Sequence, residues 1–194
     1  IACWKAPCHV DHHAPMRSAL IVGGGIMGLS AAWGFLRAGW AVRVLDQDPV
    51  PNPRGASVDR HRLIRHAYGT DVGYMRMVDD AYRAWDLLWA ELGQGLHVPT
   101  GVLVISSDGG PRFSAGRQAL LDDGRALRDL SRSEALALCP ALAPGCLAAA
   151  YALEAGGVLL ADRIVAALAA HLAARGVVFE HAQVADIDPE RASV

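Results

Sequence analysis

Three glycines and one acidic residue have the spacing of a dinucleotide-binding turn. Gly23, Gly25 and Gly28 follow a short apolar run in G-x-G-x-x-G spacing, and Asp46 ends a second apolar run. The first glycine permits a tight turn, the second lets the backbone approach a pyrophosphate, and the third lets a helix pack close to a strand. Phosphates then lie at a helix N-terminus, where unpaired N–H groups and the helix dipole favour negative charge.

Asp46 indicates which nucleotide such a turn would take. A carboxylate at the end of the second strand accepts hydrogen bonds from ribose hydroxyls and repels a 2′-phosphate, so NADP is disfavoured. The motif does not distinguish NAD from FAD, and a glycine-rich turn that binds nothing is the alternative. The strand before the turn, the helix after it and the acid at the expected distance favour the nucleotide.

A basic segment at residues 60–69 is the second candidate for chemistry. Arg62 and Arg65 lie three positions apart, so a helical turn would place both guanidinium groups on one side, near the nucleotide domain. A pair of arginines suits carboxylate recognition because each planar fork binds both oxygens. A solvated basic loop is the alternative, and the spacing alone does not decide between them.

Hydrophobic periodicity predicts the elements that position these residues. A strand at 19–22, a helix at 26–38 ended by Gly39, and a strand at 42–46 form a βαβ unit. A longer helix follows at 74–92, with an apolar stripe on one side and Asp79 and Arg83 paired on the other. Further elements are expected as a strand at 100–105, a helix at 112–122, a short helix after the capping box of Ser131 and Glu134, a strand at 148–153, a helix from the N-cap Asp162 to residue 175, and a strand at 177–181.

This order predicts an α/β protein with a Rossmann-like FAD/NAD(P)-binding domain and part of an inserted α+β substrate domain. The expected parts are a loose tail at 1–15, the cofactor-binding domain at 16–92 and 153–194, and part of the substrate domain at 93–152.

Composition limits the function classes. The chain has 194 residues, of which 53% are hydrophobic and 20% charged, and its formal net charge is −2. Neither nucleic acid nor an anionic membrane is therefore an expected partner, and no apolar stretch reaches the ~20 residues that span a bilayer. Without a C-x-x-C motif, a reducing cytoplasmic compartment is expected. No metal is expected, because the tail residues match no zinc-site spacing: Cys3, Cys8, His9, His12 and His13.

With these motifs in place, the chain resembles the N-terminal half of a FAD-dependent amine oxidase of the monomeric sarcosine oxidase type, within the D-amino-acid oxidase and glycine oxidase superfamily. The most diagnostic match is residues 62–69, Arg-Leu-Ile-Arg-His-Ala-Tyr-Gly. The other matching stretches occur in family order, at residues 21–28, 100–104, 156–159 and 180–184.

The resemblance implies roles for particular residues. Gly23, Gly25 and Gly28 would hold the FAD pyrophosphate, with Ile26 and Met27 beside them in the cofactor site. Asp46 would bind the adenosine ribose, and Val184 would touch the adenine through its backbone. Arg62 would stand near the flavin ring, and Arg65 would bind the substrate carboxylate. The implied reaction oxidises the C–N bond of a small amino acid or N-methyl amino acid, with oxygen as acceptor.

The chain departs from the family pattern in two places. Residues 57–60 are Ser-Val-Asp-Arg where members often carry Ser-His-His-Gly, and Asp46 stands where Glu is usual. In the family, the cysteine that attaches the flavin, the lysine associated with oxygen activation and a second carboxylate-binding group all come later in the chain. Cys139 and Cys146 lie in the wrong region for the flavin link, so about half of the expected enzyme is present.

Two other function classes stay open. A NAD-dependent dehydrogenase would carry no bound chromophore, whereas bound flavin is yellow. A non-catalytic FAD-binding fragment, or one subunit of a split amine oxidase or dehydrogenase, would bind flavin or a partner without turnover.

Overall fold

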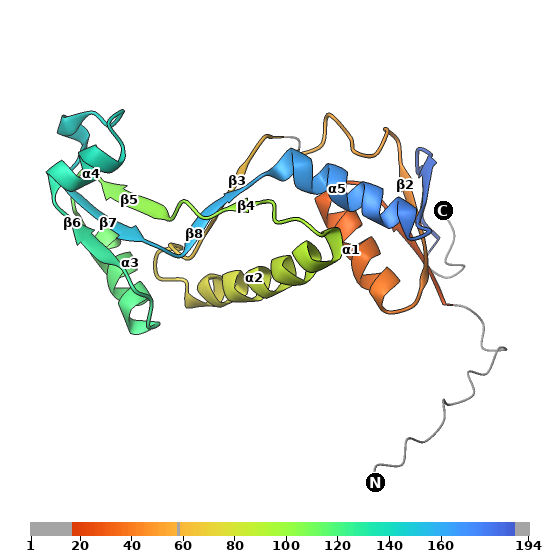
Figure 1. Cartoon of the computed structure of the whole chain (residues 1–194), viewed down its shortest axis with the longest axis horizontal. Coiled ribbons are helices and arrows are strands. Elements are labelled where there is room, and N and C mark those ends of the chain that lie inside the picture. The colour runs from red at the N-terminus through yellow and green to blue at the C-terminus, as the bar shows by residue number, and fades with distance from the viewer. Residues whose placement is uncertain (1–16, 58, 189–194) are drawn as a thin grey trace, which may run out of the picture. The chain divides into compact units, whose positions relative to one another are not determined.

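The computed structural model describes residues 17–57 and 59–188 (Figure 1). The chain packs as two compact units, one from Ile1–Gly55 with Ala169–Val194 and one from Ala56–Leu168, so the division falls within helix α5 (Ala161–Ala174). The domain boundaries expected at 92/93 and 152/153 stay a prediction. The tail at 1–15, with its cysteines and histidines, lies outside the described residues.

The first unit contains a parallel sheet in the order β1-β2-β9. Strands β1 (Ser18–Val22) and β2 (Ala41–Asp46) are joined by helix α1 (Ile26–Arg37), and β9 (Val178–His181) pairs with the other edge of β2. The central strand is the most buried, because three of its side chains form core: Val42, Val44 and Leu45. The expected βαβ unit is confirmed, and so is the later return to the same sheet.

Helix α1 packs through small and medium apolar side chains. Leu29 and Ala32 are completely buried on the same stripe of the helix. The helix ends where the sequence predicts, because Gly39 adopts a left-handed φ of 80° that other residues avoid. The N–H of Trp40 then donates to the carbonyl of Phe35 at 3.1 Å, which satisfies one of the final carbonyl groups of the helix.

The second unit begins with an antiparallel sheet in the order β3-β8-β4. Its strands are β3 (Arg62–Arg65), β8 (Gly156–Leu159) and β4 (His97–Val98), and helix α2 (Val72–Leu92) runs along it (Figure 1). The Asp71 side chain caps α2 by accepting from the N–H of Tyr74, and Gly93 ends it with a φ of 66°. The buried side of α2 consists of Met75, Val78 and Leu88.

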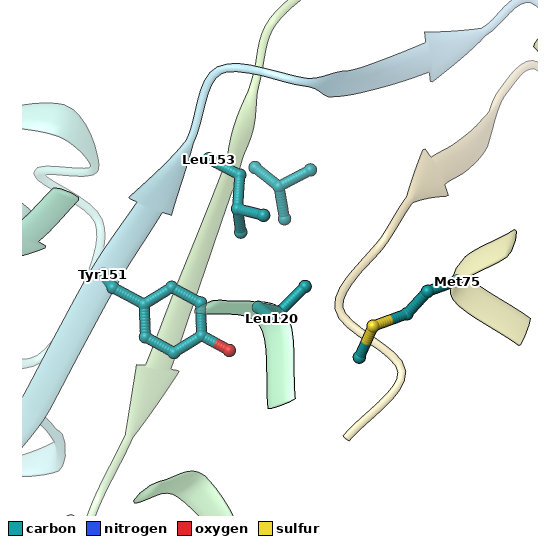
Figure 2. Close-up of a cluster of buried hydrophobic side chains, with 5 residues drawn as sticks. Met75, Leu120, Tyr151 and Leu153 are labelled. Carbon is teal, nitrogen blue, oxygen red and sulfur yellow. The ribbon is translucent and has the colours of Figure 1, made fainter. Parts of the chain in front are cut away.

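A second antiparallel sheet, in the order β5-β7-β6, has both faces covered. Tyr151 and Leu153 of the central strand join Met75 and Leu120 in one cluster (Figure 2), while Ala150 faces a second cluster. This alternation follows from the two-residue period of a strand, and burial on both faces explains the continuous apolar run of β7. The elements are β5 (Val102–Ser106), β7 (Ala149–Leu153), β6 (Arg128–Leu130), α3 (Pro111–Asp122), α4 (Arg132–Leu138) and a 3₁₀ turn, η1 (Pro144–Cys146).

Several local predictions can now be compared with the structure. The capping box of Ser131 and Glu134 is confirmed at the start of α4. Asp162 is not the N-cap of its helix, because α5 begins one residue earlier at Ala161. The expected pair of Asp79 with Arg83 is wrong: Arg83 pairs with Asp80, and Asp79 pairs elsewhere. Across residues 17–57 and 59–188, no helix is long and apolar enough to cross a membrane.

Two adjacent glycines allow strand β8 to pass close to the side chain of Val102 and the backbone of Val98. A Cβ on Gly156, whose φ is 141°, would stand 2.3 Å from a methyl group of Val102. A Cβ on Gly157 would stand 2.2 Å from the carbonyl oxygen of Val98. Strand interiors disfavour glycine, so the pair marks a close approach of neighbouring backbone and side chains.

We expect Gly156→Ala to destabilise the chain by about 2–4 kcal/mol, because it adds both a steric clash and an unfavourable φ. Gly145→Ala is the matched control, since its Cβ would meet nothing within 4 Å; it should change the free energy of unfolding by less than about 0.5 kcal/mol. Urea unfolding followed by circular dichroism measures both. Equal effects would contradict the proposed crowding of β8.

Candidate functional site

Backbone contacts shape the glycine loop, and at Gly28 they leave no room for a side chain. A Cβ on Gly28 would stand 1.8 Å from the carbonyl oxygen of Gly23, so α1 packs directly on the turn. Gly23 itself has a φ of 100°, and its N–H donates to the carbonyl of Leu45 at 2.7 Å. Gly25, by contrast, faces open space, which leaves its backbone accessible to a ligand.

The first turn of α1 is suited to an anion. Gly25 is the N-cap and supplies no side chain to the first N–H groups, and the turn holds no acidic residue. The N–H groups of Ile26 and Met27 belong to this turn, where intrahelical partners are missing. Open backbone donors and the positive end of the helix dipole together fit a pyrophosphate.

Asp46 connects the end of β2 to the glycine loop. One carboxylate oxygen accepts from the N–H of Gly24 at 2.6 Å, and the other accepts from the N–H of Asp48 at 2.8 Å. Each oxygen can accept a further hydrogen bond, so ribose hydroxyls remain possible partners. Gly24 is constrained from the other side as well, because a Cβ there would stand 2.2 Å from a methyl group of Val50.

A pocket of about 220 Å³ opens beside Asp46, within the first unit. It lies past the carboxyl ends of the three parallel strands, which is where open α/β sheets bind ligands. Its lining includes residues from each strand end: Val22, Gly23, Asp46, Gln47, Gln183 and Val184. The structure therefore brings Gly23, Asp46 and Val184 together at one pocket.

The two arginines do not share a helical turn, which corrects the expected geometry. Arg62 and Arg65 are the first and last residues of β3, where they pair with Leu159 and Gly156 of β8. Because side chains alternate along a strand, residues three apart point to opposite faces. The two guanidinium groups therefore have different surroundings.

Arg62 is held by neighbouring groups. Its guanidinium donates to the carboxylate of Asp59 and to the carbonyl oxygen of Ala56. Asp59 lies in the segment 57–60, where the chain departs from the pattern of the family that it resembles. The charge of Arg62 is thus partly neutralised by an acid that stands next to the strand.

The guanidinium of Arg65 is less constrained than that of Arg62, and it borders a pocket larger than the one beside Asp46. Its central carbon lies 4.4 Å from the centre of the Tyr68 ring, and no described carboxylate or carbonyl accepts a hydrogen bond from it. It borders a pocket of about 580 Å³ that lies within the second unit. A half-buried cation without an acidic partner is suited to binding a carboxylate.

The end of β3, where Arg65 lies, is anchored by the next residue. His66 is buried, with 3% of its surface exposed, and its Nε2 lies 3.0 Å from a carboxylate oxygen of Asp79 on α2. Arg125 donates to both oxygens of Asp79, at 2.7 and 2.6 Å, and also to Asp123. The hydrogen bonds from Arg125 hold the pKa of Asp79 well below its usual range, although burial opposes this.

Sequence reasoning missed several of these residues. Gly24 and Asp79 act through hydrogen bonds to distant parts of the chain, and no local pattern signals them. Tyr68 belongs to the diagnostic stretch at 62–69, so the sequence motif could have identified it as a candidate site residue. Phe113 and Tyr151 look like ordinary core residues in the sequence, and only the fold places them at the pocket of Arg65.

These observations define a class: an α/β protein with a Rossmann-like unit and a second unit in which an arginine borders a pocket. The family model described as "FAD dependent oxidoreductase" (DAO) matches residues 18–194. The chain belongs to this DAO family, and its cofactor is FAD.

Individual relatives agree with the family. Mouse peroxisomal sarcosine oxidase is 29% identical over 173 residues, which are 88% of this chain and 44% of that protein. N-methyl-L-tryptophan oxidase of Yersinia pestis is 32% identical over 89 residues, covering 46% of this chain and 24% of the relative. A modified fructosyl peptide oxidase from Aspergillus nidulans superposes with a TM-score of 0.71 at 26% identity, covering 84% of this chain and 40% of that one. The chain thus spans less than half the length of these relatives.

The anchoring role of Asp79 predicts a pH dependence of stability. The pKa of Asp79 is lower in the folded chain than the unfolded value of about 4, so its contribution is present above that value and is lost as the pH falls through the folded pKa. We expect Asp79→Asn to lower the free energy of unfolding most above about pH 5, with the gap to wild type narrowing below about pH 4. Urea unfolding at pH 3 to 7 measures the gap.

The neighbouring Asp80→Asn is the control, because Asp80 makes an exposed pair with Arg83. It should have a small effect that varies little with pH. A gap between wild type and Asp79→Asn that stays constant from pH 7 to 3 would contradict the assigned role.

Proposed function

We propose that this chain forms the FAD-binding part and the substrate-carboxylate site of a FAD-dependent amine oxidase. The substrate would be a small amino acid or N-methyl amino acid, resembling sarcosine, and the electron acceptor would be oxygen. The observation that carries the proposal is the guanidinium of Arg65, which has no acidic partner in the described residues and borders a pocket. Relatives named for sarcosine and N-methyl-L-tryptophan support it.

In the proposed cofactor site, the backbone carries most of the binding. Gly23, Gly25 and Gly28 would surround the pyrophosphate, with the N–H groups of Ile26 and Met27 in the same turn. Asp46 would accept from the ribose hydroxyls, and Val184 would border the adenine. Bound FAD would supply a two-electron acceptor for the α-carbon hydride of the substrate, so that the C–N bond becomes an imine and oxygen is reduced to hydrogen peroxide.

The two arginines would have separate roles in this reaction. Arg65 would bind the substrate carboxylate through its fork of donors and so fix the orientation of the amine. Arg62 would stand near the flavin ring, where positive charge stabilises an anionic reduced ring and favours the neutral form of a nearby amine. Its pairing with Asp59 would weaken that field compared with an unpaired arginine.

Alternatives remain as competing hypotheses. A non-catalytic FAD-binding fragment, or one subunit of a split oxidase or dehydrogenase, would keep the cofactor site and lack turnover. A NAD-dependent dehydrogenase is disfavoured by the family. A partner that supplies the remaining catalytic groups would be needed for a split enzyme, and neither nucleic acid nor a membrane is proposed as a partner.

The compartment is also a proposal. Cys139 and Cys146 are free thiols in this structure, which fits a reducing compartment such as the cytoplasm. The mouse relative is named as peroxisomal, so a peroxisome is the competing location.

The cofactor site can be tested on the purified chain. We expect FAD to bind with an absorption change in the visible range and NAD to bind at least about tenfold more weakly. Gly28→Ala should weaken FAD binding by tenfold or more relative to the wild-type chain, because the added Cβ would collide with the Gly23 carbonyl and displace the loop. Gly34→Ala, on the same helix with nothing within 4 Å of its Cβ, should keep wild-type affinity. A preference for NAD would overturn the proposal.

The carboxylate site can be tested in an active amine oxidase that contains this chain. We expect Arg65→Gln to raise KM by about 10- to 100-fold with a smaller change in kcat, because a charge-assisted hydrogen bond to the substrate is lost. Arg60→Gln removes a nearby exposed arginine of the same segment and should leave both constants within about twofold. Unchanged kinetics in Arg65→Gln would remove this residue from the substrate site.

A further inference from the structure

The end of strand β2 is a junction between the glycine loop and strand β9. On the side of the loop, the N–H of Gly23 donates to the carbonyl of Leu45 at 2.7 Å. The N–H of Gly24 donates to the Asp46 carboxylate at 2.6 Å. On the other side, the ladder between β2 and β9 ends at the pair of Asp46 with His181. Three segments of the first unit therefore meet at the end of β2.

One side-chain hydrogen bond continues the connection past the last ladder pair. The imidazole Nε2 of His181 lies 2.7 Å from the carbonyl oxygen of Gln47, which is the residue after β2. A carbonyl oxygen can only accept, so Nε2 carries a proton and donates it to this bond. The N–H of Ala182 donates to the carbonyl of Asp46 at 2.9 Å in the same place. The backbone just beyond both strands is thus held by two hydrogen bonds.

The residues that these bonds hold are walls of the pocket beside Asp46. Gln47 lines this pocket of about 220 Å³ from the β2 side, and residues 182–184 line it from the β9 side. The ladder between the two strands does not extend to these residues. The separation of the two walls is therefore set in part by the hydrogen bond of His181.

The side chain of His181 is exposed and is not part of the hydrophobic core. A single hydrogen bond of an exposed side chain contributes little to the stability of a domain. Its effect on a ligand can be larger, because a wall that is ordered before binding does not have to lose conformational freedom when the ligand arrives. The bond of His181 to Gln47 therefore suits preorganisation of the pocket better than it suits stabilisation of the fold.

The neighbouring residue provides a contrast. Glu180 also joins β9 to β2, because its carboxylate accepts two hydrogen bonds from Arg43 at 2.7 and 2.9 Å. Adjacent residues of a strand point to opposite faces, and neither Glu180 nor Arg43 lines the pocket beside Asp46. The two strands thus have one side-chain link that holds a pocket wall and another that does not.

We propose that His181 is a positioning residue for the adenosine half of FAD. Its Nε2–H holds the carbonyl of Gln47 and so keeps the two walls of the pocket apart by the distance that they have before adenosine binds. The inference rests on the proposed cofactor site, in which Asp46 and Val184 would contact the ribose and the adenine. His181 acts through Gln47 and does not itself touch the cofactor.

The test compares ADP with inorganic pyrophosphate on the full 194-residue chain by isothermal titration calorimetry. ADP carries the adenosine and the pyrophosphate of FAD, whereas pyrophosphate alone can occupy only the glycine loop. We expect the wild-type chain to bind ADP at least about tenfold more tightly than pyrophosphate, because adenosine is buried beside Asp46. His181→Ala should weaken ADP binding by about three- to tenfold and leave pyrophosphate binding within about twofold, because only the adenosine walls lose their support.

Further variants separate the hydrogen bond from the bulk of the ring. His181→Gln places an amide N–H close to the position of Nε2, so it should bind ADP within about twofold of wild type. His181→Asn is too short to reach the Gln47 carbonyl and should lose ADP affinity as His181→Ala does. Glu180→Gln is the matched control, because it weakens the pair with Arg43 on the other face of the same strands; it should leave both affinities within about twofold. Urea unfolding of each variant shows that the folded chain is being compared.

The outcomes distinguish the inference from the proposed function. Wild-type ADP affinity in His181→Ala would overturn the positioning role and leave the cofactor site standing. Equal losses for ADP and pyrophosphate would overturn it as well, because His181 would then support the whole loop. If His181→Ala does not fold, equal ADP affinities of His181→Gln and His181→Asn would overturn the role of the hydrogen bond. A wild-type chain that binds no ADP would overturn the proposed cofactor site and the inference with it.

Discussion

The contact between Gly28 and the backbone of Gly23 is the constraint on which the glycine loop of the first unit depends. With only 1.8 Å available for a Cβ, helix α1 can start directly above the turn that follows β1. That position directs the open first turn of α1 toward the carboxyl ends of the parallel strands. Asp46 then holds the loop from the next strand through the N–H of Gly24. A backbone contact and one carboxylate thus shape the loop for which we propose a pyrophosphate.

The second unit uses side chains to hold its parts in place. Asp79 and Arg125 hold the buried ring of His66, and this fixes the residue next to Arg65 without using the guanidinium of Arg65 itself. Arg62, at the other end of the same strand, is held directly by Asp59. The two arginines differ because one is fixed through its own charge and the other through its neighbour. Only the second is left with a charge that can meet a ligand.

The sequence predicts the parts of this arrangement that depend on local chemistry. Three patterns depend only on residues that are close in the sequence: the glycine spacing, the helix periods and the capping box of Ser131. The turn and the helices that they predict are present in the structure. The misses depend on contacts between distant residues. Strand β8 contains two glycines that strands normally avoid, so it was not predicted, and without it β3 could not be recognised as its partner. Asp79 was paired with Arg83 because helix spacing cannot reveal Arg125.

This division between backbone and side chains has a consequence for specificity. A cofactor site made of glycine backbone, one acid and a helix terminus tolerates changes elsewhere, so relatives can keep FAD while other positions vary. A pocket bordered by side chains such as Arg65, Tyr68 and Phe113 changes its shape when those side chains are replaced. The relatives fit this expectation, since they include oxidases named for sarcosine, N-methyl-L-tryptophan and fructosyl peptides. The second unit is therefore where substrate choice within the family is expected to be encoded, around an arginine whose own position is fixed by His66.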